Sequence, residues 1–167
     1  RLPLAVGLRD VQLVLARGVR EVGDPPPVGA PRGVALRHPG GAVEVAGEAL
    51  KNGAEYLGVA RINEAVQLRT AGLDAPILIF GYTPPDLAGA LIEYGLTQTV
   101  YSFSAASRLS EYARQKGAKI CVHIKADSGM GRLGLPLILD DGKSPGYRRL
   151  QTSVLEVASI SRLSGLT

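Results

Sequence analysis

Short apolar runs alternate with amphipathic segments from residue 41 onward in this chain of 167 residues. The runs with strand character are residues 56–60, 76–80, 99–101 and 120–125. The segments between them carry apolar residues at helical spacing. Strand centres lie about 20 residues apart, and this repeating order favours a parallel sheet covered by helices.

A (β/α) barrel and a doubly wound sheet both have this repeating order. The barrel is favoured because the units are even and no glycine-rich dinucleotide loop follows a strand. Residues 129–134 spell G-x-G-x-x-G, but the helix and the acidic strand residue that should follow are missing. The chain holds about five units, whereas a closed (β/α)8 barrel needs about 250 residues. We therefore expect an α/β fold that is a partial TIM-type barrel, which is open, completed by a partner or part of something longer.

Residues 1–40 differ in character from the rest of the chain. Residues 24–33 contain four prolines and can form neither a helix nor a central strand. Residues 8–22 carry Val11, Leu15 and Val19 at four-residue spacing, which predicts a helix. Residues 34–36 are too short to assign. We expect a weakly structured N-terminal segment, residues 1–40, and a barrel domain, residues 41–167.

Local chemistry predicts several details of the helices. Asn63 is suited to cap the helix that runs to Gly72, and Thr83 is suited to cap the helix that begins with two prolines. The predicted buried stripes include Val45 in the first helix of the barrel domain and Val154 in the last helix.

The composition excludes several classes of protein. The net charge is +4, but the arginines are scattered and aromatic residues are few, so no nucleic-acid partner is expected. The single cysteine, Cys121, fits a reducing compartment and is predicted to be a small core residue. No apolar run approaches the roughly 20 residues of a membrane span, and Arg9 and Asp10 interrupt the apolar residues of a signal peptide. We expect a cytoplasmic protein with no membrane partner and no metal.

The best candidate site follows the last predicted strand. Lys125 ends this strand and Arg132 lies on the glycine-punctuated loop after it, at the sheet end where parallel α/β folds bind ligands. His123 alternates onto the same face as Lys125 and is predicted to be structural. Asp127 and Ser128 are predicted to shape the turn, and the loop glycines to serve the backbone conformation.

Residues 54–65, 75–81, 96–101 and above all 125–134, Lys-Ala-Asp-Ser-Gly-Met-Gly-Arg-Leu-Gly, resemble the N-terminal barrel of alanine racemases. The resemblance runs from about residue 41 to 135 and resumes over the last helix. It implies a barrel that binds pyridoxal 5′-phosphate, is joined to a C-terminal β domain and works as a homodimer. Such enzymes interconvert L- and D-alanine for cell-wall peptidoglycan, with the cofactor as electron sink.

The resemblance also implies roles for three residues. Arg132 matches the family arginine beside the cofactor ring hydroxyl and the substrate carboxylate, a planar anion that suits a guanidinium. Lys125 matches a lysine that many members carry as a carbamate, an anion that would hold Arg132 in place. Phe80 matches an apolar position that lines the cofactor pocket, where the family more often has leucine.

The important departure from the family lies upstream. The lysine that forms the imine with the cofactor precedes an Ala-Asn/Asp-Ala-Tyr-Gly-His-Gly motif in the family. Counted back from Gly41, its position holds Val34, and the tyrosine position holds His38. The first lysine of the chain is Lys51, on a predicted helix. The resemblance therefore implies no catalytic residue in this chain and little or no activity. An altered reading frame or a replaced segment would produce such a front end, residues 1–40.

Two other hypotheses follow from the residues. The chain is a non-catalytic pyridoxal-phosphate-binding barrel or pseudo-enzyme, or it is a fragment that folds poorly. Poor folding would result because a partial barrel exposes sheet edges and an apolar helix face.

Overall fold

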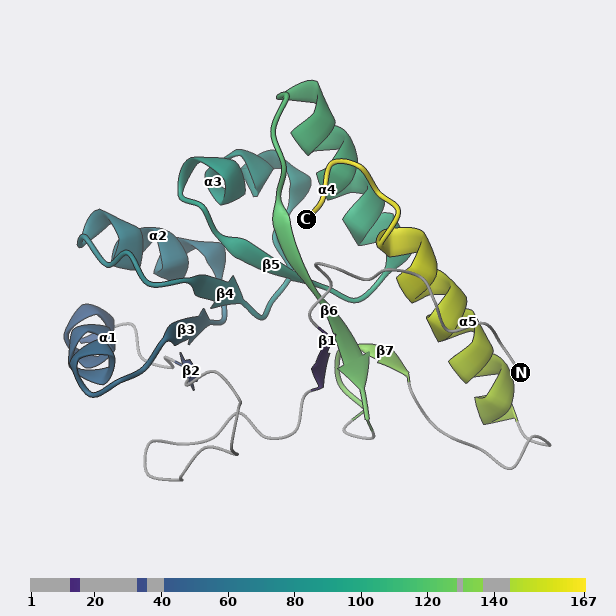
Figure 1. The fold of residues 1–167 in the computed structure, drawn as a ribbon, viewed down its shortest axis with the longest axis horizontal. Coiled ribbons are helices and arrows are strands. Elements are labelled where there is room, and N and C mark those ends of the chain that lie inside the picture. Colours follow the sequence, from purple (N-terminus) through teal and green to yellow (C-terminus); the bar gives the residue numbers. More distant parts are fainter. Residues whose placement is uncertain (1–12, 16–32, 36–40, 129–130, 137–144) are drawn as a thin grey trace.

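The computed structural model of the chain describes residues 13–15, 33–35, 41–128, 131–136 and 145–167. In these ranges the strands form one sheet, in the order β1-β6-β5-β4-β3-β2, with every pair parallel and with β7 paired to β6 (Figure 1). The strands are β1 Leu13–Leu15, β2 Gly33–Ala35, β3 Tyr56–Val59, β4 Ile77–Ile79, β5 Thr97–Val100, β6 Cys121–Asp127 and β7 Leu135–Pro136.

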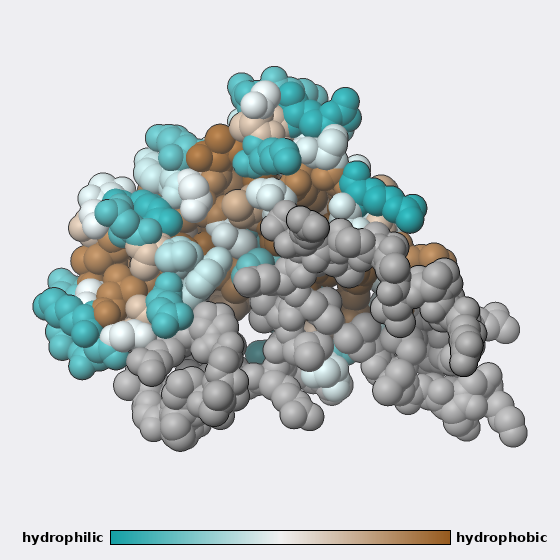
Figure 2. All heavy atoms as spheres, viewed as in Figure 1, coloured by the Kyte–Doolittle hydropathy of each residue, from teal (hydrophilic) through white to brown (hydrophobic). Residues whose placement is uncertain are grey.

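Helices connect the successive strands from β2 to β6, and one more helix follows β7. They are α1 Ala42–Lys51, α2 Ile62–Thr70, the 3-10 turn η1 Pro85–Leu87, α3 Ala88–Glu93, α4 Phe103–Gln115 and α5 Pro145–Ile160. Figure 1 shows the helices along the outer side of a curved sheet, and Figure 2 shows hydrophilic residues over α1 and the end of α4. The open parallel sheet with alternating helices confirms the predicted α/β class. None of the described helices is long and apolar enough to cross a membrane.

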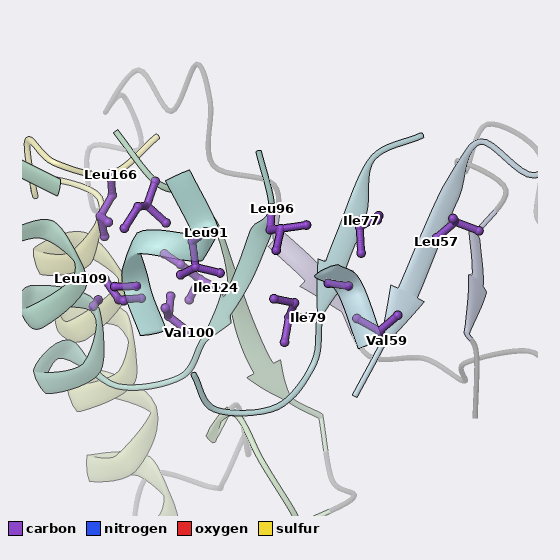
Figure 3. Close-up of a cluster of buried hydrophobic side chains, with 14 of the residues drawn as sticks. Leu57, Val59, Ile77, Ile79, Leu91, Leu96, Val100, Leu109, Ile124 and Leu166 are labelled. Carbon is purple, nitrogen blue, oxygen red and sulfur yellow. The ribbon is translucent and has the colours of Figure 1, made fainter. Parts of the chain in front are cut away.

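The pairing register sorts the strand residues onto two faces. One face, the helix-covered face, carries the apolar core between sheet and helices (Figure 3). Its strand residues are completely or almost completely buried: Leu57, Val59, Ile77, Ile79, Val100 and Ile124. Successive residues of a strand point to opposite faces, so the residues between these belong to the other face, which we call the inner face.

The inner face is polar in the middle of the sheet. The register aligns Thr97 with Cys121 and Thr99 with His123. The Tyr56 hydroxyl reaches across β4 to lie 3.4 Å from Thr97 Oγ1, and the Tyr56 and His123 rings are 6.1 Å apart between centroids. His123 therefore sits in a layer of hydroxyl and aromatic groups.

The structure corrects two predictions for the ends of the sheet and assigns a third segment. Residues 13–15 form β1, a strand, so the helix predicted for residues 8–22 is wrong at its centre. Residues 33–35 form β2, although the run was too short to assign from the sequence. Residues 135–136 form β7 within a stretch predicted to be a loop. All three are short segments whose hydrogen-bond partners come from distant parts of the chain, which local periodicity does not reveal.

Both predicted helix caps are wrong. At the start of α2, the Glu64 carboxylate accepts hydrogen bonds from the backbone N–H groups of Ala60 and Arg61, at 2.8 and 2.9 Å, and Asn63 is already inside the helix. At the start of η1, Pro84 precedes the first turn without a side-chain cap. The Thr83 hydroxyl instead donates a hydrogen bond to Gln98 Oε1.

Three predicted core residues are exposed. Val45 on α1 is 51% exposed and Val154 on α5 is 56% exposed, because each helix contacts the sheet along a narrower stripe than the sequence pattern suggested. Cys121 is also exposed, since it lies at the amino end of β6. The prediction that it belongs to the core is wrong.

A buried glutamine joins β5 to the segment after β4. Gln98 is 2% exposed, and its Oε1 accepts a hydrogen bond from the Thr83 hydroxyl at 2.5 Å. Its Nε2 donates to the carbonyl oxygens of Gly81 at 2.6 Å and Thr99 at 2.7 Å. The side chain thereby satisfies polar groups that would otherwise be buried without partners.

We predict that Gln98→Leu destabilises the fold by about 2–4 kcal/mol, because it leaves the Thr83 hydroxyl and the Gly81 carbonyl without their partner. Urea denaturation followed by far-ultraviolet circular dichroism measures this change. Gln67→Leu, at an exposed position of α2, is the control and should alter stability by less than about 0.5 kcal/mol. Equal effects of the two substitutions would contradict this role of Gln98.

We also predict that stability falls as the pH drops below about 6.5, the ordinary pKa of histidine. Burial lowers the pKa of His123 in the fold, so the unfolded chain takes up a proton that the folded chain resists, and the neutral side chain favours folding only above this pH. His123→Asn should flatten the pH dependence of the denaturation midpoint between pH 7.5 and 5.5. His38→Asn, which replaces the other histidine, should leave it unchanged, and the reverse pattern would refute the assignment.

Candidate functional site

Lys125 lies near the carboxyl end of β6, in the same inner-face row as His123. It is half-buried, between the fully buried Ile124 and Ala126, which belong to the helix-covered face. The Lys125 side chain therefore lies on the inner face, as the alternation in the sequence predicted. A half-buried amine here is positioned to meet an anion.

The loop after β6 folds back onto the end of the same strand. β7 pairs with β6 so that Leu135 lies beside Ala126 and Pro136 beside Asp127. At Gly134, with φ 137°, a Cβ atom would come within 2.7 Å of the Asp127 backbone nitrogen, a contact that only glycine avoids. Glycine at this position serves the backbone, as predicted, and the tight packing holds the loop against β6.

Arg132 lies on this returning loop, and its side chain is exposed. The loop begins after Asp127 and ends at Gly134, so Arg132 and Lys125 are at the same end of the sheet. A guanidinium and an ammonium are both groups that can bind a carboxylate or a phosphate.

Phe80 follows β4 at the same carboxyl edge. Its backbone N–H donates to the Val59 carbonyl at 2.8 Å, and the next residue, Gly81, donates to the Ala60 carbonyl at 3.1 Å. Phe80 is half-buried, and Gly81 packs so closely that a Cβ atom would lie 2.4 Å from the Ala60 oxygen. The strand end is thus fixed, and Phe80 offers an apolar ring at the edge where the two cations lie.

Two polar atoms of the inner face have no hydrogen-bond partner although they are buried. They are Thr99 Oγ1 and His123 Nδ1, from register-paired residues of β5 and β6. Burial lowers the pKa of His123, which favours the neutral ring. His123 is therefore suited to hydrogen bonding and unsuited to carrying a positive charge, in agreement with its predicted structural role.

The position predicted for the imine lysine lies on β2. The register pairs Val34 with Leu57 and pairs Ala35 with Gly58. The register partner Leu57 is buried on the helix-covered face, whereas Lys125 is on the inner face. Lys51 projects from α1 into solvent, with its Nζ 3.6 Å from Glu48 Oε2. His38 lies outside the described residues.

The sequence did not single out a shallow hollow at the ends of β4 and β5. Tyr82, Thr83, Tyr101 and Arg108 are among its lining residues. Tyr101 follows β5 at once and Tyr82 follows β4 after two residues, and that spacing was the signal available in the sequence. Among the described residues, no group of three or more His, Cys, Asp or Glu is placed to hold a metal ion.

Comparison with known proteins agrees with this geometry. The family model for the N-terminal domain of alanine racemase matches residues 35–142. Alanine racemase 1 of Clostridium acetobutylicum is 45% identical over 126 residues, which are 75% of this chain and 30% of that protein. The chain thus spans about 30% of the length of this relative.

Solved structures give the same result. An alanine racemase of Clostridium difficile 630 has a TM-score of 0.64 and 38% identity, over 75% of this chain and 30% of that one. A histidine racemase of Leuconostoc mesenteroides has a TM-score of 0.59 and 26% identity, over 74% and 30% of the two chains. The sheet with its outer helices is therefore part of a TIM-type barrel.

The match extends over the strand end that carries Lys125 and over the loop that carries Arg132, because both lie within residues 35–142. Fold, motif and sequence identity agree, and the chain belongs to the alanine racemase family through its N-terminal domain.

Proposed function

We propose that this chain is the part of an alanine racemase barrel that supports cofactor and substrate, and that it does not interconvert L- and D-alanine by itself. The observation that carries the proposal is the arrangement of Lys125 and Arg132 at one carboxyl edge of the sheet, with Phe80 at the same edge. In this proposal the full-length relatives act on alanine as homodimers, in the cytoplasm. The single cysteine is consistent with that reducing compartment.

Covalent attachment of pyridoxal phosphate does not fit the residues of this chain. Position 34 is a valine, and Lys51 is in solvent beside Glu48. Among the described residues, the lysine on the inner face is Lys125, which the family resemblance assigns a supporting role. We therefore derive no chemical step through the cofactor in this chain.

The residues present are suited to hold anions. Arg132 provides a planar guanidinium, which binds a carboxylate or a phosphate through two parallel hydrogen bonds. Lys125 stands half-buried on the strand beside it. If Lys125 carries a carbamate, as the resemblance implies, its negative charge would orient Arg132. Phe80 would contact the ring of the cofactor.

A non-catalytic barrel that binds pyridoxal phosphate is the second candidate, and the valine at position 34 is the observation that favours it. The two candidates differ in substrate recognition. A barrel that only binds the cofactor needs a site for a phosphate ester, whereas the racemase proposal requires that Arg132 also binds the carboxylate of alanine. Calorimetric titration of L-alanine into the chain saturated with pyridoxal phosphate distinguishes them, because only the racemase proposal expects heat of binding.

We predict that pyridoxal phosphate binds reversibly and that no D-alanine forms from L-alanine above the blank without protein. Borohydride reduction followed by peptide mapping should show no stoichiometric adduct at a single lysine, because the imine position is Val34. The cofactor absorbance should disappear on dialysis. A stoichiometric adduct that survives dialysis would show that another lysine takes this role.

We predict that Arg132→Gln weakens the affinity for pyridoxal phosphate about three- to tenfold, because it removes a charge-assisted hydrogen bond. Arg132→Lys should retain part of the affinity, since an ammonium keeps the charge but not the planar geometry. Arg114→Gln, at an exposed position near the end of α4, is the matched control. Fluorescence titration gives the three dissociation constants, and the same constant for Arg132→Gln and the control would exclude Arg132 from the site.

A further inference from the structure

Tyr101 and Lys125 are the residues that follow the last register pair of β5 and β6. That pair is Val100 with Ile124, and the two strands advance together because they are parallel. Ser102, the residue after Tyr101, is still extended, with φ −155° and ψ 148°, so the extended backbone of β5 continues through position 101. Tyr101 and Lys125 are therefore neighbours on adjacent strands, whose backbones lie about 4.8 Å apart.

The side chains of these two residues belong to the inner face. Val100 and Ile124 are each 1% exposed and lie in the core of the helix-covered face. Successive residues of a strand point to opposite faces, so the side chains of Tyr101 and Lys125 lie beside one another on the inner face. Both residues are half-buried. The carboxyl end of β5 thus places an aromatic hydroxyl next to the cation of β6.

The Tyr101 hydroxyl is available to a ligand. Within the described residues it makes no hydrogen bond, whereas the Tyr56 hydroxyl, lower on the same face, lies 3.4 Å from Thr97 Oγ1. The polar atoms of the row between them, Thr99 Oγ1 and His123 Nδ1, are buried. Tyr101 therefore provides the hydroxyl of the inner face that a ligand at the carboxyl edge meets.

Tyr101 also borders the shallow hollow at the ends of β4 and β5, together with Arg108. Four consecutive residues, 98–101, border this hollow. Their side chains alternate between the two faces, so the main chain of β5 forms this wall. Arg108 belongs to α4, on the helix-covered side, where its Nε and Nη2 lie 3.3 and 3.4 Å from the carbonyl and hydroxyl oxygens of Ser104. A ligand in the hollow would contact Arg108, whereas a ligand on the inner face would not.

We propose that Tyr101 is a ligand-contacting residue of the candidate site, and that its hydroxyl donates a hydrogen bond to the anionic group that Lys125 and Arg132 bind. This inference rests on the proposed function and deepens it, because it adds a neutral donor to two cations. An ammonium attracts an anion as a point charge, whereas a phenol hydroxyl donates along one direction. Tyr101 thus fixes where an oxygen atom of the carboxylate or phosphate lies.

Two probes distinguish the possible sources of the anion. Pyridoxamine 5′-phosphate provides the phosphate and forms no imine with lysine, so its binding is non-covalent. L-alanine, titrated by calorimetry into the chain saturated with this compound, provides the carboxylate. Tyr101→Phe removes the hydroxyl but keeps the ring, and it should weaken the affinity for one of the two probes about three- to tenfold. Tyr94→Phe, at a half-buried position between α3 and β5 at the amino edge, is the matched control and should change neither affinity.

A spectroscopic measurement on the unaltered chain makes the test independent of any loss of stability in the variant. The chain has six tyrosines, and labelling with ¹³C at the tyrosine Cζ makes each of them visible by nuclear magnetic resonance. The signal that is missing in Tyr101→Phe belongs to position 101, and the signal that is missing in Tyr94→Phe belongs to position 94. The probe that Tyr101 contacts should shift the first signal and leave the second in place.

The outcomes separate this inference from the proposed function. Unchanged affinities of Tyr101→Phe for both probes, or a signal of position 101 that neither probe shifts, would overturn the inference and leave the proposed function standing. An equal loss of affinity in Arg108→Gln would place the ligand in the hollow and would overturn the inference as well. No binding of pyridoxamine 5′-phosphate to the unaltered chain would refute the proposed function and this inference with it.

Discussion

Parallel pairing between β5 and β6 is the interaction on which the rest of the structure depends. It aligns Val100 with Ile124 and Thr99 with His123, and so gives the sheet one apolar face and one polar face. The apolar face buries the leucines and isoleucines against the helices (Figure 3), which supplies the hydrophobic free energy of folding. The polar face is the one to which Lys125 belongs. Stability and the candidate site are thus two consequences of one register.

The cost of burying polar groups explains details on both faces of the sheet. Gln98, although buried on the helix-covered side, has three hydrogen bonds that tie two strand ends together. Thr99 Oγ1 and His123 Nδ1 have none and are buried. Unpaired buried groups destabilise a fold, and proteins tolerate them mainly where a function or a further group requires them. Here they lie in the layer next to Lys125.

An open sheet also has to protect its edges. β1 and β2 are the outermost strands, and both come from the part of the chain that least resembles the family. Uncovered edges pair readily with other chains. The short β1 covers half of the β6 edge, and residues 165–167 cover the rest.

The sequence by itself determined the order of the central elements, the family and the end of the sheet where the candidate site residues lie. Alternating runs such as residues 120–125 and helical stripes such as that of α4 depend on neighbouring residues, so local periodicity reveals them. The motif that contains Lys125 and Arg132 likewise carries its information locally.

Only the tertiary structure decided which groups meet across the sheet. Thr83 has the residue type of a helix cap, yet it bonds to Gln98, because a buried amide on β5 offers a stronger competing partner. Residues 13–15 have a helical pattern, yet they form a strand, because β6 offers unpaired backbone groups. The pairing of Val34 with Leu57 is likewise a contact that only the structure reveals. Each of these outcomes is fixed by contacts between residues far apart in the chain, which no local pattern encodes.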